Sequence, residues 1–450
     1  MTFDPLILLR NTEARHRYLD IMQAALDAVD PYRAVREQMR VEAGTLWVGD
    51  RSYRLARFRR ILVVGAGKAG APMARAVEDV LGDALAGGLV IVKSGHAAPT
   101  VRIELVEASH PIPDQVGVAA GQRMLAQVEA AGADDLVLAL LSGGGSALLE
   151  APAGITLAEL QAMTDALLAC GATINEINCL RKHVSRVKGG QLARAASPAT
   201  LVTLVLSDVV GSPLDVIASG PTVPDSTTWA DAWAVVERYK LQERLPVAVL
   251  ARLTAGRQGQ LPDTPKPGDP LFVGAHTCVV GDNRVAALAA CRRAEALGYR
   301  TLLLTSFVEG EAAEVAKVAV AVAREVRASG HPLAAPACLV LGGETTVTLG
   351  DAPGRGGRNQ ELALAASRLL DGMAGVTVAS LATDGSDGPT DSAGGLVDGE
   401  TIMRGRAGGL DADAALRRHD AYPSLRATGD LLLTGPTQTN VNDLIFVWVE

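Results

Sequence analysis

The strongest constraint on the fold of this chain is a series of short, uninterrupted apolar runs separated by helix-like stretches. Four of them lie in the first half of the chain: "ILVV" from residue 61, "LVIV" from residue 89, "LVLALL" from residue 136 and "LVTLVL" from residue 201. Such runs are typical of strands buried on both faces of a parallel sheet. A second series begins after residue 275. The sequence therefore predicts an α/β fold with helices packed on largely parallel sheets.

Chain length and one proline-rich stretch predict two domains. At 450 residues the chain exceeds what one hydrophobic core usually supports. Residues 241–269 end in "LPDTPKPGD" and lack apolar periodicity, which is typical of a domain boundary. We expect residues 1–240 to form a Rossmann-like domain with a parallel sheet, and residues 241–450 a second α/β domain with a mixed sheet. Helices within residues 11–39 are expected to cover the first sheet, and the tail from residue 430 to form a hairpin.

Composition excludes several classes of partner. Lys and Arg number 42 against 50 Asp and Glu, a net charge of −8, which argues against nucleic acid or an anionic membrane as the main partner. The five cysteines are scattered and form no C-x-x-C pair, so neither a disulfide framework nor a zinc site is indicated. No secretory signal or membrane span is evident. We expect a soluble cytoplasmic protein that acts on a small molecule, with a homodimer as one expected assembly.

The first candidate site is "GAGKAG", which follows a predicted strand and opens a predicted helix. Gly65 and Gly67 begin a G-x-G-x-x-G pattern, whose glycines bring backbone N–H groups against a phosphate. A dinucleotide site also needs an acidic residue after the second strand, where this chain has Lys93. Lys68 lies inside the turn and would attract an anion. The alternative is a solvated lysine at a tight turn.

Two further small-residue turns follow predicted strands. The run "SGGGS" supplies uncovered N–H groups and hydroxyls that suit an oxyanion or phosphate, although it could be only a flexible turn; its residues are Ser142, Gly143, Gly144, Gly145 and Ser146. In "SDVVGSPLDVIASGPT", Asp208 could hold Mg²⁺ or cap a helix, and Ser219 and Gly220 form a second turn. Asn283, after the strand "TCVVGD", is a further candidate for phosphate binding.

The second half of the chain supplies an arginine and a group of carboxylates. Arg358 opens a predicted helix, where a guanidinium is unfavourable unless it meets an anion, either a ligand or Glu361. Glu344 follows a strand, and Asp384 and Asp387 share the loop "ATDGSDGPTD". Hard carboxylate oxygens suit Mg²⁺, although an ordinary acidic turn is the alternative. The basic segment "RKHVSRVKGG" could be a solvated helix face or part of an anion site.

Cations, backbone nests and carboxylates together are the groups that phosphoryl transfer requires. The ordered motifs "GAGKAG", "SGGGSALL", "NCLRKHVSRVKGGQLA", "SDVVGSPLDVIASGPT", "GGETTVT", "GRGGRNQE" and "ATDGSDGPTDSAG" resemble the class II glycerate 2-kinases, whose C-terminal portion is the MOFRL domain. The resemblance implies transfer of phosphate from ATP to D-glycerate with Mg²⁺, and an active site between two α/β domains. It also implies that the family's important lysine and arginine are Lys68 and Arg358.

Two other function classes remain open from the sequence. Members of this family have often been labelled hydroxypyruvate reductases, in connection with tartrate or serine metabolism, and Lys93 would suit a phosphorylated nicotinamide cofactor. The lack of an obvious acid–base histidine in a matching motif argues against that reductase. The third class is a non-catalytic sensor of nucleotide or acid. Asp208, Glu344, Asp384 and Asp387 are all candidates for holding Mg²⁺ or for activating the substrate hydroxyl.

Overall fold

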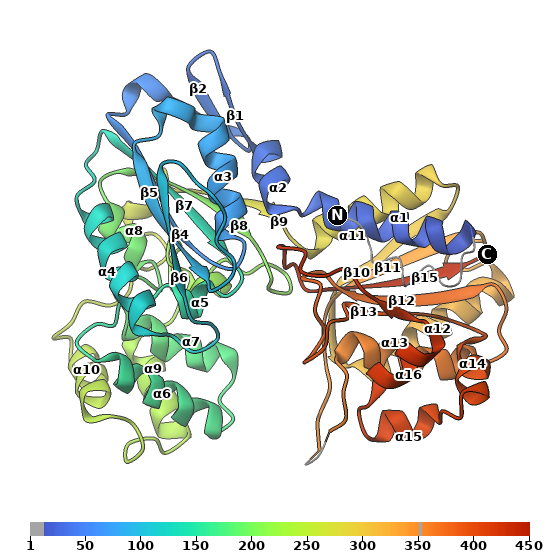
Figure 1. The fold of residues 1–450 in the computed structure, drawn as a ribbon. Helices are drawn as coiled ribbons and strands as arrows, with labels where there is room; N and C mark the ends of the chain where they lie inside the picture. The colour runs from blue at the N-terminus through green and yellow to red at the C-terminus, as the bar shows by residue number, and fades with distance from the viewer. Residues whose placement is uncertain (1–12, 351–352) are drawn as a thin grey trace. The chain divides into compact units, whose positions relative to one another are not determined.

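The structure, a computed structural model, describes residues 13–350 and 353–450 and divides them into two compact units (Figure 1). The insert unit is Pro31–Val280, and the terminal unit combines the described part of Met1–Asp30 with Gly281–Glu450. This division differs from the expected boundary after residue 240. The C-terminal segment of the terminal unit begins only at Gly281, and the unit also includes α1, the first helix that the structure describes.

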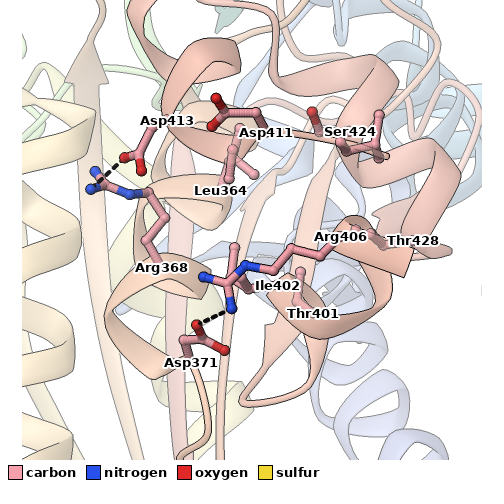
Figure 2. A pocket seen from close by; sticks show the side chains of 13 residues that line it. Leu364, Arg368, Asp371, Thr401, Ile402, Arg406, Asp411, Asp413, Ser424 and Thr428 are labelled. Carbon is pink, nitrogen blue, oxygen red and sulfur yellow. Dashed lines mark ion pairs between the residues drawn. The ribbon is translucent and has the colours of Figure 1, made fainter. Parts of the chain in front are cut away.

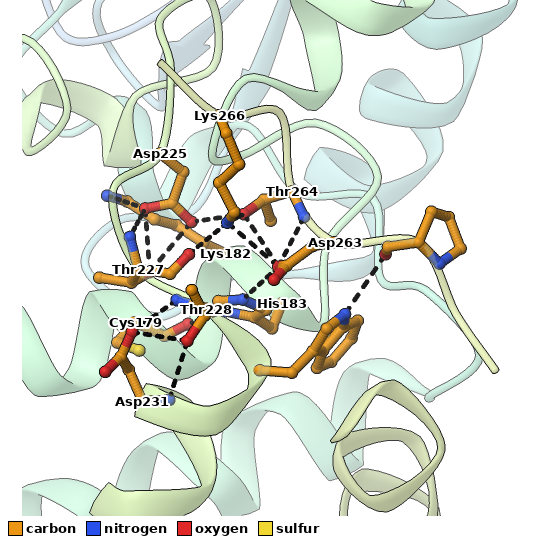
Figure 3. Close-up of polar contacts among 12 residues, drawn as sticks. Cys179, Lys182, His183, Asp225, Thr227, Thr228, Asp231, Asp263, Thr264 and Lys266 are labelled. Carbon is orange, nitrogen blue, oxygen red and sulfur yellow. Dashed lines mark hydrogen bonds and ion pairs between the residues drawn. The ribbon is translucent and has the colours of Figure 1, made fainter. Parts of the chain in front are cut away.

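The proline-rich stretch is not a linker because its polar side chains bond into the insert unit (Figure 3). Asp263 lies 3.1 Å from Nε2 of His183, which ends helix α7 (Ile174–His183). The hydroxyl of Thr264 donates to Asp225 at 2.9 Å, and Lys266 pairs with Asp263 at 3.1 Å. Prolines remove backbone donors without preventing such side-chain bonds, so low apolar periodicity was a misleading boundary signal here.

The first helix belongs to the terminal unit, so the expectation that it covers the first sheet is wrong. Helix α1 (Glu13–Ala28) stacks Tyr18 on Trp448 with ring centroids 4.2 Å apart, and the Tyr18 hydroxyl donates to Glu450 at 2.7 Å. Arg15 pairs with the buried Asp430 at 2.6 Å. Helix α2 (Pro31–Gln38) instead packs on α3 (Gly70–Leu81) of the insert unit.

The insert unit contains the predicted Rossmann-like sheet. Its six strands lie in the order β6-β5-β4-β7-β8-β9, and each neighbouring pair from β6 to β8 is parallel. This order reverses direction between β4 and β7, the point at which ligands bind in open sheets of this kind. The strands are β4 (Arg60–Ala66), β5 (Gly87–Lys93), β6 (Ile103–Ala108), β7 (Asp135–Ser142), β8 (Thr200–Leu206) and β9 (His276–Gly281).

Helices surround this sheet and also form a cluster of their own. Besides α2 and α3, α4 (Gln115–Glu129), α5 (Gly145–Leu148) and α8 (Gln191–Ala196) lie near the sheet, and α7 packs with three other helices around Leu160, Trp229 and Leu253. Those three are α6 (Leu157–Ala169), α9 (Trp229–Arg238) and α10 (Val247–Arg257). A small antiparallel sheet comprises β1 (Met39–Glu42), β2 (Thr45–Val48) and β3 (Arg51–Arg54).

The terminal unit has the predicted mixed sheet, but its last strand is not part of a hairpin. The order is β10-β11-β15-β12-β13-β14, so β15 lies between β11 and β12 and is antiparallel to both. Every residue of β15 is buried, which requires neighbours on both sides. The strands are β10 (Arg300–Glu311), β11 (Ala337–Thr346), β12 (Val376–Ala382), β13 (Gly394–Asp398), β14 (Leu431–Leu432) and β15 (Asp443–Val449).

Helices cover both faces of the mixed sheet (Figure 1). Helices α1 and α11 lie on one face, and α12, α13 and α16 lie on the other. The bounds are α11 (Asn283–Ala296), α12 (Ala312–Ser329), α13 (Arg358–Leu370), α14 (Thr401–Ala407), α15 (Ala412–Arg417) and α16 (Ala421–Thr428). Among the described helices of both units, none combines the length and apolarity needed to cross a membrane.

Candidate functional site

The G-x-G-x-x-G turn after β4 is packed against the end of β7, and its amides are already bonded. Gly67 donates to Ile91 O at 3.0 Å, Lys68 to Gly143 O at 2.8 Å and Ala69 to Ser142 Oγ at 3.1 Å. A Cβ on Gly67 would lie 2.1 Å from Ser142 Oγ. The glycines therefore serve close packing of two loops, and the structure does not support the expected role of Gly65 and Gly67 in phosphate binding.

The nest after β7 has the free donors that the first turn lacks. In the part of the chain that the structure describes, the backbone N–H groups of Gly144, Gly145 and Ser146 make no hydrogen bond to another backbone group. Gly144 has φ +80°, and Gly144 and Ser146 are half-buried rather than fully covered. Successive free N–H groups form a concave site for an anion. The hydroxyl of Ser142, in contrast, is buried and accepts from Ala69.

A buried hydrogen-bonded network supports this glycine nest, residues 142–146. The Ser146 hydroxyl lies 3.0 Å from that of Ser219, which donates to Asn178 Oδ1 at 3.0 Å. Ser219 is fully buried and has φ +60°, a strained value for a residue with a side chain. Gly220 has φ +61° and packs on the backbone of Asp215. Ser219 therefore supports the nest through the hydroxyl of Ser146, and Gly220, the next residue, packs on Asp215.

Two residues of the basic segment predicted as a solvated face or an anion site, Arg181 and Lys188, are covered and bond to the nest, whereas Arg186 of the same segment is exposed. Lys188 is fully buried and donates to Ser146 O at 2.7 Å and Leu149 O at 2.6 Å. Arg181 donates to Ser146 O at 2.6 Å, and both cations pair with the buried Glu150. Burial lowers the pKa of Lys188 to about 8, although Glu150 opposes the shift. Their charges are used to fix the peptide groups of the nest.

Lys68 lies among further basic groups at the carboxyl ends of β4, β5 and β6. His96 Nδ1 lies 3.1 Å from Lys68 O, and a carbonyl only accepts, so Nδ1 carries the proton. A Cβ on Gly144 would lie 3.2 Å from His110 Nε2 and 3.3 Å from Lys68 Cγ. Burial, together with Lys68 and Lys93, lowers the pKa of His110 to about 4. The charges of Lys68 and Lys93 therefore make this edge of the sheet positive, which suits an anion.

Asp208 lies on the other side of the nest. A Cβ on Gly143 would lie 2.1 Å from Asp208 Oδ2, so the glycine lets this carboxylate approach the turn closely. Asp208 follows β8 in the chain, as Gly143 follows β7. The predicted Lys68, glycine nest and Asp208 are thus brought together at one edge of one sheet.

Arg358 binds carboxylates of its own unit, and its partners differ from both expectations. It pairs with Asp443 at 2.5 Å and with Glu344 at 2.8 Å, whereas Glu361 lies 3.1 Å from His419. Asp443 is buried at the start of β15, and burial raises its pKa to about 6, while Arg358 opposes the shift. The Arg358 side chain is 34% exposed to solvent, so it can still contact a ligand.

The expected Mg²⁺ ligands do not gather. Asp387 is buried and caps α13, because its two oxygens accept from the N–H groups of Asn359 at 3.1 Å and Gln360 at 2.8 Å. Glu344 pairs with Arg358, and Asp384 accepts from Ser386 at 3.0 Å. Among the described residues, no three His, Cys, Asp or Glu side chains lie close enough to hold a metal ion. In the described part of the chain, Asp384 forms no ion pair and is half-buried, whereas Glu344 is paired with Arg358 and Asp387 is buried.

Arg358 and Asp384 line a cavity of about 570 Å³ in the terminal unit. Its wall includes backbone of the glycine loop before α13, with Gly356 and Gly357, and also His419. Asn283, a predicted phosphate ligand, lies elsewhere in this unit: it is buried and donates to the carbonyls of Val441 and Asp443, both at 2.9 Å. Its amide therefore holds the turn that carries Asp443.

A second cavity of about 390 Å³ in the terminal unit contains none of the predicted site residues (Figure 2). Both arginines are paired within it, Arg406 with Asp371 at 3.0 Å and Arg368 with Asp413 at 2.5 Å, and its third carboxylate, Asp411, caps α15. The cavity that contains Arg358 is therefore the better candidate for a ligand.

A dinucleotide site expects an acidic residue about 20 positions after the glycine turn. The acidic residues nearest to that position all have partners within the protein. Glu78 accepts from the N–H groups at the start of β6, including Ile103 at 2.7 Å. Asp79 accepts from Tyr32 at 2.7 Å, and Asp83 pairs with Arg102. At the end of β5 the chain has Lys93, and the carboxylate of Glu107 beside it already accepts from the N–H group of Gly95 at 2.6 Å, so it is also occupied.

Several residues of the site were missed by the sequence analysis. His96 and His110 follow β5 and β6 closely, so the rule that ligands meet residues after strands could have found them. Because both rings lie near Lys68, the lack of an obvious acid–base histidine in a matching motif no longer argues against a reductase. Asn178 and Asp443 carried no local signal, since their partners are distant in the sequence.

Comparisons with known proteins cover both units. Residues 17–254 match the model of a domain of unknown function, DUF4147, and residues 337–443 match the MOFRL family. The chain is 40% identical over 432 residues, 96% of each chain, to a protein of Pyrococcus horikoshii named glycerate 2-kinase. It is 47% identical over 387 residues, 86% of each chain, to an Agrobacterium vitis protein whose name provisionally assigns it as a hydroxypyruvate reductase. A crystal structure of glycerate kinase from Thermotoga maritima superposes with a TM-score of 0.87 at 40% identity, covering 97% of this chain and 99% of that one.

Proposed function

This chain belongs to the class II glycerate 2-kinase family, and we propose that it transfers the γ-phosphoryl group of ATP to the C2 hydroxyl of D-glycerate, giving 2-phosphoglycerate and ADP. The observation that carries this proposal is the nest with free amides beside Lys68 at the switch point of the sheet. Lys68 and Lys93 stand at the same edge together with the rings of His96 and His110, where a ribose-binding carboxylate would be needed for a nicotinamide cofactor.

The insert unit supplies fixed positive potential. Lys68 and the amides of Gly144, Gly145 and Ser146 would hold an anionic group, either the carboxylate of glycerate or a phosphate. Catalysis of phosphoryl transfer is mostly positioning and stabilisation of the charge on the moving group. Donors that are already held in place, as Lys188 and Arg181 hold the nest, do not need to reorganise during the reaction.

For the terminal unit we assign Arg358 to a second anion and Asp384 to the metal. The cavity of about 570 Å³ offers both a guanidinium and a carboxylate to a ligand. Mg²⁺ is usually held by one or two carboxylates plus substrate phosphates, so Asp384 fits it, whereas Asp387 does not because both its oxygens accept amides. Bound Mg²⁺ would neutralise charge on the phosphates of ATP.

The decisive experiment measures ADP and 2-phosphoglycerate from purified protein with D-glycerate, ATP and Mg²⁺. We expect Lys68→Ala to lower kcat/KM by about 10²-fold or more, the size expected for loss of a fixed charge at the transition state. The matched control is Lys317→Ala, since Lys317 is exposed and pairs with Glu314 on its own helix. Near-normal turnover by Lys68→Ala would remove this lysine from the site.

The second candidate is an NAD(P)H-dependent hydroxypyruvate reductase, which the name of the Agrobacterium vitis relative favours. A parallel incubation with hydroxypyruvate and NADH or NADPH tests it through loss of absorbance of the reduced cofactor. Turnover in neither assay, combined with binding of ATP or glycerate, would indicate a sensor. The five free cysteines agree with our proposal of a reducing cytoplasm, and sedimentation would test the proposed homodimer.

A further inference from the structure

His110 has a position at the glycine nest that the proposed function has not yet used. It follows β6 closely in the chain, and its ring lies over the backbone of Gly144, where a Cβ would lie 3.1 Å from Cδ2 and 3.2 Å from Nε2. The stem of Lys68 approaches the same point at 3.3 Å. The imidazole and the lysine thus flank the first free amide of the nest.

The surroundings of His110 keep its ring neutral near pH 7. In the part of the chain that the structure describes, the charged groups that lower its pKa are Lys68 after β4, Lys93 at the end of β5 and His96 in the following loop, while Asp208 approaches the nest from the Gly143 side. Burial and these cations lower the pKa of His110 to about 4. A neutral imidazole has one nitrogen with a lone pair, and so it can accept a proton from a hydroxyl group.

We propose that His110 is a catalytic residue that accepts the proton of the substrate hydroxyl as that hydroxyl is phosphorylated; this rests on the proposed kinase function. The O–H bond breaks and its proton passes to the imidazole nitrogen. The hydroxyl oxygen bonds to the γ-phosphorus while the bond from that phosphorus to the bridging oxygen of ADP breaks. The imidazolium then releases its proton to solvent, and the positive charge that it carries meanwhile is matched by the anion at Lys68.

Asp208 is the competing proton acceptor, because it approaches the nest from the Gly143 side. The two candidates differ in the charge that each places beside the anionic phosphate. A carboxylate beside the transferred group is suited to a metal ion, whereas a neutral imidazole adds no negative charge to a site that must hold an anionic phosphate. His96 is less well placed, since the atoms nearest to the Cβ position of Gly144 belong to His110 and Lys68, whereas the recorded contact of the His96 ring is with the Lys68 carbonyl.

The test compares His110→Gln with wild type in kcat, KM, pH profile and binding of D-glycerate by calorimetry. Glutamine keeps a hydrogen-bonding side chain but cannot take the proton. We expect kcat to fall about 10²-fold or more, the usual effect of losing a general base. We also expect KM and the calorimetric Kd for D-glycerate to stay within about threefold and the acid limb of the pH profile of kcat to disappear. His331→Gln, an exposed histidine in the terminal unit, is the matched control.

Each outcome has a defined meaning. The inference is overturned if His110→Gln keeps kcat within about threefold of wild type, if only KM and Kd rise, or if the acid limb persists and is lost in Asp208→Asn instead. His110→Asn replaces His110→Gln if the latter gives no folded protein by circular dichroism. Wild-type protein that forms no ADP from D-glycerate and ATP would overturn the proposed function together with this inference, whereas an active wild type with an unaffected variant overturns the inference alone.

Discussion

Replacing Lys188 by methionine should destabilise the insert unit strongly, although Lys188 contacts no proposed ligand. Its fully buried ammonium donates to two carbonyls, Ser146 O at 2.7 Å and Leu149 O at 2.6 Å, and lies 3.1 Å from the buried Glu150. Lys188→Met would leave both carbonyls without this donor, while Glu150 keeps Arg181 at 2.7 Å. Breaking a buried pair costs about 3 to 5 kcal/mol, and the remaining arginine favours the lower end, about 3 kcal/mol.

Urea unfolding followed by tryptophan fluorescence measures this effect, because Trp229 lies in the insert unit. The double variant Lys188→Met with Glu150→Gln should recover part of the loss, since the carboxylate that lost a cation is then neutral. Lys317→Met, at an exposed lysine, should leave the transition in place. A Lys188→Met transition within about 1 kcal/mol of wild type would refute the assignment of Lys188 as the support of the nest.

Three other substitutions test separate features. Gly144→Ala should cost about 1 to 2 kcal/mol of stability, because Gly144 has φ +80° and the new methyl group would press on His110 and Lys68. Urea unfolding and kcat would both report this change. An unchanged kcat would contradict the placement of the nest. Asp387→Ala should destabilise the terminal unit by about 1 to 2 kcal/mol through loss of the α13 cap, without changing the concentration of Mg²⁺ required; a raised Mg²⁺ requirement would restore Asp387 as a ligand. The pKa of His110 is lowered to about 4 in the folded state, so the unfolded chain binds more protons and stability should fall as the pH falls from 6.5 towards 4; urea midpoints across this range should fall less in His110→Gln, and equal slopes would argue against a neutral ring.

Most strands of both sheets could be predicted because they are continuous apolar runs, and continuity is a local property of the sequence. The exceptions include β6, which carries Glu104 and Glu107, and β13, which begins with two glycines. The place of β15 between β11 and β12 could not be predicted, because its neighbours come from segments far apart in the chain. The residues that follow strands were predicted well for Lys68, the glycine nest and Asp208, since the carboxyl ends of parallel strands share one edge. His110 also follows a strand, but β6 was not recognised as one in the sequence.

The partners of charged residues were the least predictable part of the site. Arg358 was expected to need an anion, which was sound reasoning from the helix dipole, yet the anion is Asp443, which lies 85 residues later. Asp387 was expected to bind metal, but a carboxylate that follows a strand can equally cap a distant helix. Composition and spacing describe what a side chain can do, and only the fold decides which neighbour uses it.

The terminal unit is built from both ends of the chain, and this has a consequence for synthesis on the ribosome. Helix α1 is made before the insert unit, whereas Trp448 and Glu450, which Tyr18 contacts, are made after it. The insert unit between them can complete its sheet much earlier. Helix α11, which α1 also contacts, is made before β15, so α1 can pack first on α11 and complete its contacts only when β15 has been made.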